Sequence, residues 1–299
     1  MQSAPIDLLF LRRRFERRAP TADFIFREIA ARMRERLQLV RLDPQRILDA
    51  GCGSGADLPA LQKNYPKAHV IGLDATHASL QSALLEQTAA QQSLQKMLAQ
   101  WLRAVGGKPN TQLIEGDFGA VPLAEQSFEL VWSNLALHWH PEPDAVFAEW
   151  RRLLRVNGLL MFSCFGPDSL KEIRQAFSGV DDTPHSLPFV DMHDFGDMLV
   201  NAGFATPVMD MEIITLTYDT VPQLFADVRA LGGNPLLTRR KALMGKVAWQ
   251  RVCSRLEAMR NPDGRIPLTL EIIYGHAFRP VPRSTKPGES IIKFDRLKK

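Results

Sequence analysis

Short apolar runs alternate with longer amphipathic stretches through the middle of this chain. The runs occupy Arg46–Ala50, His69–Asp74, Gln112–Asp117, Phe128–Asn134 and Leu159–Ser163. Brief, mostly apolar runs of this kind are typical of strands that are covered on both faces. Helical patterns at Leu58–Asn64, Ala78–Val105 and Pro143–Leu154 separate them, and Asn157-Gly158 reads as a turn. Alternating strands and helices predict an α/β fold with a mostly parallel sheet and helices on both faces.

The flanking regions show a different pattern. Residues 1–45 carry a helical stripe that ends at Asp43-Pro44, and its members are Ile25, Ile29, Met33 and Leu37, widened by Ala30 and Leu39. Beyond the fifth run, helices are expected at Asp194–Ala202, Val221–Ala230 and Arg239–Met259, and strands at Val208–Leu216 and Leu268–His276. We therefore predict an N-terminal helical lid (1–45), a core (46–165), a substrate-side α+β region that completes the sheet (166–280) and a basic tail (281–299).

The composition fits a globular protein with a sizeable core. The 299 residues are 45% hydrophobic and 23% charged, which is ordinary for a folded domain. No apolar run reaches the roughly 18 residues of a membrane span, and no basic stretch precedes the first apolar patch, so a secretory signal is not expected. The three cysteines are too widely spaced for a zinc site or a disulfide framework. These features favour a cytoplasmic protein with no bound metal.

Positive charge is unevenly distributed, although the net charge is only +4. Ten arginines and four acidic residues lie between Arg12 and Arg41, and a second basic cluster runs from Arg239 to Arg260. Solvated helix faces would explain such runs, and so would docking of an acidic partner. No combination of aromatic and basic residues suggests nucleic-acid binding.

A glycine-rich loop follows the first predicted strand and precedes a helix. Asp49 is followed by Gly51, Cys52, Gly53 and Gly55, a G-x-G-x-G spacing that differs from the G-x-G-x-x-G of dinucleotide sites. Glycine permits close approach of a ligand to the backbone, and a helix start offers free N–H groups to a carboxylate. With Asp49 available for an ammonium group, the loop suits the amino acid end of S-adenosylmethionine. A tight turn without a ligand is the alternative.

Two further strand ends carry acidic residues in a suitable order. Asp74, followed by Ala75, lies about 20 residues beyond the loop, where a carboxylate can accept both ribose hydroxyls; it could instead cap a helix. Asp117 and Phe118 follow the third strand and could contact the adenine amine and ring, although an aspartate there is often only a turn residue. Taken together, the three strand ends predict an S-adenosylmethionine site.

The loop after the fourth strand lies near the expected position of the transferred methyl group. Asn134 and Leu135 are expected to contact the cofactor. His138 and Trp139 face either the substrate or the core, and the position of the loop makes a functional role reasonable.

These motifs resemble those of class I S-adenosylmethionine-dependent methyltransferases, which have a Rossmann-like fold. More narrowly, the chain resembles the malonyl-acyl-carrier-protein O-methyltransferase (BioC) family of biotin synthesis. The residues that carry this narrower resemblance are Trp132–Ala136 with Trp139, Asp168–Phe177, Asp181 with Pro184-His185, and Ile266–Thr269. The resemblance extends from about Phe15 to Phe278.

The resemblance implies methyl transfer from S-adenosylmethionine to the free carboxylate of a malonyl group on an acidic acyl-carrier protein, which would dock on a basic surface. A cationic or donor group must hold this carboxylate, and Arg17, His138 and Trp139 are the candidates near the site. One departure is clear: the family has a lid tyrosine after Phe-x-Arg, but here Phe15-Glu16-Arg17 leads into Ala19–Phe24, which has none.

Two alternatives remain open on the sequence. Asp23–Leu37, Arg240–Leu243 and Arg260–Gly264 also resemble a mitochondrial relative that hydroxylates an arginine and assists complex I assembly. The second alternative is methylation of another small acid or of an amine.

Overall fold

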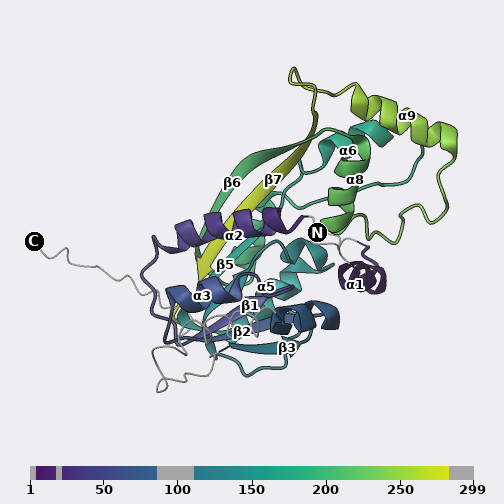
Figure 1. Cartoon of the computed structure of the whole chain (residues 1–299). Helices are drawn as coiled ribbons and strands as arrows, with labels where there is room; N and C mark the ends of the chain where they lie inside the picture. Colours follow the sequence, from purple (N-terminus) through teal and green to yellow (C-terminus); the bar gives the residue numbers. More distant parts are fainter. Residues whose placement is uncertain (1–4, 18–21, 86–110, 283–299) are drawn as a thin grey trace, which may run out of the picture.

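The computed structural model describes residues 5–17, 22–85 and 111–282, and within them seven strands form one sheet in the order β3-β2-β1-β4-β5-β7-β6 (Figure 1). The strands are β1 (Arg46–Ala50), β2 (His69–Asp74), β3 (Thr111–Glu115), β4 (Phe128–Ser133), β5 (Leu154–Phe165), β6 (Ala205–Tyr218) and β7 (Ile266–Phe278). Strands β1 to β5 pair in parallel, whereas β7 is antiparallel to both β5 and β6. The predicted α/β class and the mostly parallel, Rossmann-like sheet are confirmed.

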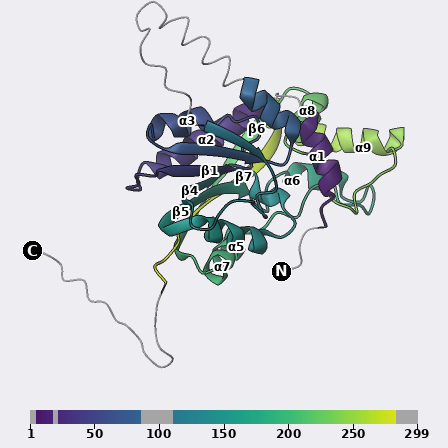
Figure 2. The ribbon, with the colours of Figure 1, turned by 90° about the horizontal axis from the view of Figure 1, so that it is seen from below.

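The helices pack on both faces of this sheet, as Figure 2 shows. They are α1 (Leu8–Glu16), α2 (Asp23–Leu37), α3 (Leu58–Asn64), α5 (Pro143–Leu153), α6 (Lys171–Phe177), α7 (Met192–Asn201), α8 (Val221–Ala230) and α9 (Lys246–Glu257), with a further helical stretch over residues 77–85. One core cluster joins the sheet to α2, α3, α6, α8 and α9. The other joins its opposite face to α5 and α7 through Phe147, Trp150 and Phe195.

The sheet topology determines where a ligand can bind. The order reverses between β1 and β4, because β1 is followed by β2 and β3 on one side and by β4 and β5 on the other. Connections that run to opposite sides leave a crevice beyond the carboxyl ends of the strands at such a point. The glycine-rich loop after β1 therefore lies at the crevice, beside the residues that follow β2 and β4.

Part of the N-terminal segment belongs to the core. Helix α2 buries Ile25, Ile29, Met33 and Leu37, as the stripe predicts, but Leu39 lies past the helix end and is exposed. Arginines of α2 also bind carboxylates of the edge strand β6. Helix α1 lies apart from this packing, and an antiparallel bridge between Ile6 and Leu236 ties the residues before it to the loop after α8.

The bounds of most predicted elements differ from the structure by a few residues, and two differ by more. The helix expected at Arg239–Met259 begins at Lys246, because Arg239 and Arg240 are occupied elsewhere: Arg239 binds Asp7 and lies over the ring of Phe10, and Arg240 binds Asp181. The run at Leu159–Ser163 is part of the longer strand β5, which contains Asn157 at a positive φ of 63° where the register shifts against β4. Pairing with a neighbouring strand thus extends strand structure beyond the apolar run.

Some predictions lie outside the described residues. These are most of the expected helix Ala78–Val105, of which only the beginning is described and is helical, the residues Ala19–Thr21 in the lid, and the basic tail from residue 283 onward. None of the described helices is long and apolar enough to cross a membrane.

Candidate cofactor and substrate site

A cavity of about 830 Å³ lies beyond the carboxyl ends of β1, β2, β3 and β4, with α1 and the start of α2 completing its wall. Most of the site residues predicted from the sequence line it: Asp49, Gly51, Cys52, Gly53, Asp74, Ala75, Asp117, Phe118, Asn134, Leu135 and Trp139. Gly55, His138 and Arg17 do not. The fold therefore brings together residues that are up to 90 positions apart along the chain, from Asp49 to Trp139.

The glycines of the loop have different roles. Gly51 has φ +82°, and a Cβ there would lie only 2.4 Å from the Cβ of Ala136. Gly53 has φ +53°, and a Cβ there would have no protein atom within 4 Å. Gly55 lies outside the cavity wall and would place a Cβ 2.9 Å from the Cβ of Ala83. Gly51 and Gly55 thus permit close packing of the chain, and Gly53 leaves open space.

Asp49 is a buried carboxylate without a full set of partners. Its side chain is 1% exposed, and within the described residues its Oδ2 atom has no hydrogen-bond partner. Burial, and then the negative charges of Asp57 and Asp74, raise its pKa well above the usual value. A buried carboxylate of this kind is costly unless a cation or donor reaches it. The ammonium group of S-adenosylmethionine is such a partner, so the residues fit the amino acid end of the cofactor.

We expect the affinity for S-adenosylmethionine to fall as the pH is lowered through the raised pKa of Asp49. A positive ligand favours the ionised carboxylate, so binding releases the proton that Asp49 holds at lower pH. Titration calorimetry in buffers of different ionisation enthalpy will measure this release. In Asp49→Asn the release should disappear together with much of the affinity. An unchanged proton release in that variant would contradict the assignment.

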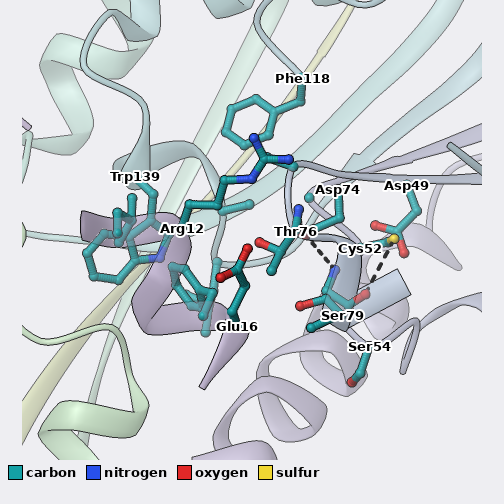
Figure 3. Close-up of a pocket in the computed structure, with 18 of the residues that line it drawn as sticks. Arg12, Glu16, Asp49, Cys52, Ser54, Asp74, Thr76, Ser79, Phe118 and Trp139 are labelled. Atoms are coloured by element: carbon teal, nitrogen blue, oxygen red, sulfur yellow. Dashed lines mark hydrogen bonds between the residues drawn. The ribbon is translucent and has the colours of Figure 1, made fainter. Parts of the chain in front are cut away.

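Asp74, at the end of β2, holds the loop and faces the cavity (Figure 3). Its Oδ2 accepts a hydrogen bond from the Gly53 N–H (3.0 Å), and its Oδ1 accepts one from the Thr76 N–H (2.8 Å). These bonds fix the plane of the carboxylate between the two loops. That geometry suits the acceptance of two ribose hydroxyls.

Aromatic and polar groups surround the Phe118 end of the cavity. The Phe118 ring lies 5.7 Å from that of His140 and 5.9 Å from that of Trp150, measured between centroids. Trp150 also donates to the Phe118 carbonyl, which fixes the backbone there. The Oδ1 of Asp117 accepts from the Gly119 N–H, so this aspartate does shape a turn as well as line the cavity. A flat apolar face beside a carboxylate suits adenine.

The loop after β4 is held rigidly against its neighbours. The Asn134 amide donates to the Phe26 carbonyl of α2 and accepts from the Ser163 hydroxyl of β5. Leu135 has φ +50°, and its N–H donates to Ser163. The hydrogen bonds at the two ends of the Asn134 amide therefore fix the orientation of this side chain at the cavity wall.

His138 lies in an aromatic cluster behind the cavity wall. Its ring is buried among those of Trp139, Phe165 and Phe189, with centroid distances of 4.6, 4.7 and 5.6 Å. Burial lowers its pKa to about 3, so the imidazole is neutral near neutral pH. The structure gives His138 a packing position, and Trp139 stands between it and the cavity as a wall residue.

Replacing His138 with glutamine should change stability more than the pH profile of catalysis. Folding lowers the histidine pKa from 6.5 to about 3, so the folded state binds fewer protons and loses stability as the pH falls from 6.5 towards 3. The variant should lack this component of acid unfolding, which circular dichroism at graded pH will show. The kcat/KM profile around neutrality should keep its shape. A profile that loses an ionisation in His138→Gln would restore a catalytic role for this residue.

Arg17, the other charged candidate, ends α1 and is exposed outside the cavity wall. Arg12, five residues earlier, is the arginine that reaches over the cavity (Figure 3). Its guanidinium binds Glu115 at the end of β3 (2.6 Å). This ion pair connects α1 to the sheet. The sequence did not single out Arg12, because several arginines cluster in this segment and they differ only in the direction that each faces around the helix.

Other wall residues also escaped the sequence analysis. They are mainly the small polar side chains Thr76 and Ser79 at the start of the helical stretch after β2, and the lid residues Phe15, Glu16 and Phe26. Phe24, the nearest aromatic residue to the missing lid tyrosine, is exposed and does not line the cavity. Across the described ranges no group of three or more histidine, cysteine or acidic side chains could hold a metal ion.

Residues 48–162 match the family model described as a methyltransferase domain. Relatives named malonyl-[acyl-carrier protein] O-methyltransferase include one from Gallionella capsiferriformans, 44% identical with 98% of each chain covered. Another, from Laribacter hongkongensis, is 45% identical over 95% of this chain and 94% of the relative. A third, from Nitrosospira multiformis, is 43% identical over 94% and 92%.

Two solved structures share the fold. A proposed methyltransferase from Bacillus halodurans C-125 has a TM-score of 0.57 at 17% identity and covers 84% of this chain and 99% of its own. The YcgJ protein of Bacillus subtilis has a TM-score of 0.55 at 14% identity, covering 88% and 99%.

Proposed function

The chain belongs to the malonyl-[acyl-carrier protein] O-methyltransferase family, and we propose that it methylates the free carboxylate of a malonyl group carried on acyl-carrier protein, in biotin synthesis. It is an S-adenosylmethionine-dependent methyltransferase of class I. The observation that carries the proposal is the single continuous cavity that runs from Asp49 and Asp74 to Trp139 beneath α1. Its volume is within the roughly 300–1,000 Å³ of small-molecule sites.

The chemistry requires little of the protein beyond positioning. S-adenosylmethionine supplies a methyl group on a positively charged sulfur: as a carboxylate oxygen bonds to the methyl carbon, the carbon–sulfur bond breaks and its electron pair stays on sulfur. A malonyl carboxylate is already ionised at neutral pH, so no general base is needed. We propose that Asp49, Asp74 and Phe118 orient the cofactor. Orientation lowers the activation free energy of methyl transfer, because the translational and rotational entropy is already lost when the reactants bind.

The lid contributes exclusion of water. Phe15 of α1 and Trp139 meet edge to face, with ring centroids 5.7 Å apart, and both line the cavity. Within the described residues the indole Nε1 of Trp139 has no hydrogen-bond partner, so it can donate to the malonyl carboxylate. An apolar wall with one donor would hold the nucleophile without solvating it fully, which favours the transition state over the bound ground state.

The test is transfer of a labelled methyl group to malonyl-acyl-carrier protein, with product identified as the methyl ester by its sensitivity to mild base. Rescue of a biotin auxotroph that lacks the methyltransferase provides a second readout. Succinyl and amine acceptors form the control panel for the alternative substrates. No methyl transfer to any acid, together with copurification of a respiratory subunit, would instead favour the hydroxylase or assembly role.

The structure changes the view of the basic segments. Many of the clustered arginines are neutralised by carboxylates of this chain: Arg12 by Glu115, Arg32 by Glu212, Arg36 by Asp210, Arg239 by Asp7 and Arg240 by Asp181. By contrast, Arg13 on α1 and Arg17, the residue directly after this helix, are exposed and form no ion pair with any described residue. The exposed Leu8 and Leu9 lie on the same helix and line the cavity. We propose this face of α1 as the docking surface for the acidic carrier protein.

Reversing the charge of Arg13 and Arg17 together, as Arg13→Glu with Arg17→Glu, should raise the KM for malonyl-acyl-carrier protein roughly 5- to 10-fold at low salt. The effect should shrink as salt screens the charges, and kcat should change little. Steady-state kinetics will measure it. Lys246→Glu combined with Arg251→Glu, at exposed positions of α9, changes the net charge by the same amount and is the matched control. An equal rise in KM for both variants would mean that net charge matters and that the α1 surface does not.

A further inference from the structure

Two arginines from separate helices lie together beside the site. Arg14 is on α1, and Arg229 is next to the last residue of α8. The Nη2 of Arg14 donates to the Arg229 carbonyl over 3.3 Å. The side chain of Arg14 is partly buried, and desolvation, followed by the positive charge of Arg229, lowers its pKa. Arginine remains charged at neutral pH all the same, so the fold holds two positive charges close together.

Neither guanidinium is neutralised within the part of the chain that the structure describes. No carboxylate lies within ion-pair distance of Arg14 or of Arg229, although Arg12, Arg32, Arg36 and Arg239 each have one. The bond from Arg14 to a carbonyl uses one of its five donors. The two like charges repel each other, and the guanidinium of Arg14 is also partly desolvated, so an anion between the two arginines would stabilise the arrangement.

The position of the pair connects it to the cavity. Arg229 is followed, after two residues, by Gly232 and Gly233, both at positive φ. A Cβ on Gly232 would lie 2.5 Å from the Trp139 ring, which is a wall of the cavity, and a Cβ on Gly233 would lie 3.5 Å from the Nη2 of Arg14. The two glycines therefore let the end of α8 approach both Trp139 and Arg14. Figures 1 and 2 both show α1 beside α8.

We propose that Arg14 and Arg229 bind a phosphate ester, namely the phosphate of the prosthetic arm through which the carrier protein presents the malonyl group. This inference rests on the proposed function, since it assumes an acceptor on such an arm. A guanidinium pairs with phosphate oxygens through two parallel hydrogen bonds, and two guanidinium groups from different helices can hold one phosphate from both sides. With the phosphate there, the thioester end enters past Trp139.

The bond to phosphate would also hold the lid. Arg14 is on α1 and Arg229 belongs to the substrate-side region, so a phosphate between them connects α1 to α8. The bridge between Ile6 and Leu236 already fixes the start of α1 to this region. An acceptor that carries the phosphate should therefore bind with α1 held against α8. An acceptor without the phosphate should bind more weakly, because it lacks this connection between the two helices.

The experiment compares two acceptors that differ only in the phosphate, malonyl-phosphopantetheine and malonyl-pantetheine, without the carrier protein. With the natural chain, the KM should be about 10- to 100-fold lower for the phosphorylated acceptor, which is the effect of one or two charge-assisted hydrogen bonds. In Arg14→Gln the ratio of the two KM values should fall towards 1. Arg229→Gln is a second variant at an exposed position, in case the first disturbs the lid. Arg251→Gln is the matched control and should keep the ratio of the natural chain.

Several outcomes would overturn the inference. If the natural chain methylates malonyl-acyl-carrier protein but has equal KM values for the two small acceptors, no phosphate subsite exists and the proposed function stands. If Arg14→Gln raises both KM values in proportion, Arg14 only supports the lid. If inorganic phosphate binds to the natural chain as tightly as the phosphorylated arm does, the arginine pair is a site for a free anion. If no malonyl acceptor is methylated at all, the proposed function fails first.

Discussion

Replacing Asp74 with alanine is expected to weaken the binding of S-adenosylmethionine by about 100- to 10,000-fold. The carboxylate is proposed to accept two ribose hydroxyls, and each hydrogen bond to a charged group contributes about 1.5–3 kcal/mol, where 1.4 kcal/mol corresponds to a factor of ten. The substitution also removes the acceptor of the Gly53 and Thr76 N–H groups, which orient the loop. Asp74→Asn should have an intermediate effect, because it keeps one oxygen acceptor.

Isothermal titration calorimetry with S-adenosylmethionine and with S-adenosylhomocysteine will measure the loss. Both ligands contain the ribose, so both should weaken in parallel. Asp144→Ala, at an exposed position in the first turn of α5, is the control for loss of one negative charge. If Asp74→Ala melts at the natural temperature and still binds both ligands within threefold, Asp74 does not hold the ribose, and its role is limited to the loop.

The second large effect is expected for Gly51→Ala, which should destabilise the fold and abolish cofactor binding. The new Cβ would lie 2.4 Å from the Cβ of Ala136, far inside van der Waals contact. Overpacking of this kind costs about 1–3 kcal/mol, and a φ of +82° adds about 1–2 kcal/mol for a residue with a side chain. Urea unfolding should therefore show a loss of about 2–5 kcal/mol.

Two companion variants separate the causes. Ala136→Gly combined with Gly51→Ala removes the close Cβ pair and should recover the packing component, leaving only the backbone cost. Gly53→Ala has no protein atom within 4 Å of its new Cβ, so it should lose only about 1–2 kcal/mol of stability. Because Gly53 lines the cavity, that variant should nevertheless bind S-adenosylmethionine poorly. Equal stability losses at Gly51 and Gly53 would contradict the packing argument.

The strand ends were predictable from the sequence because their signals are local. Buried strands are short apolar runs, and Gly51, Asp74 and Asp117 follow such runs directly, so a parallel sheet places them at one edge without further information. The bounds of elements were less predictable. Arg239 to Gly245 have a helical pattern, yet the pairing of Arg239 with Asp7, more than 200 residues away, holds them in a loop.

The individual roles within the site depended on long-range packing. His138 and Trp139 are neighbours in the sequence, but one is packed behind the wall and the other forms it. Arg12 reaches the cavity whereas Arg17 does not, a difference that reflects where α1 lies relative to the sheet. The charge of the basic segments likewise could not be assessed until their carboxylate partners were located across the molecule.

The sequence by itself determined the class of fold, the cofactor and the family, since these depend on runs, spacings and strand ends that are read within a few residues. Only the tertiary structure decided which arginines are neutralised, which aromatic residue lines the cavity, and that Arg14 and Arg229 lie together. The physical reason is that ion pairing, burial and like-charge proximity depend on distances through space, and residues 215 positions apart along the chain leave no local pattern of their contact.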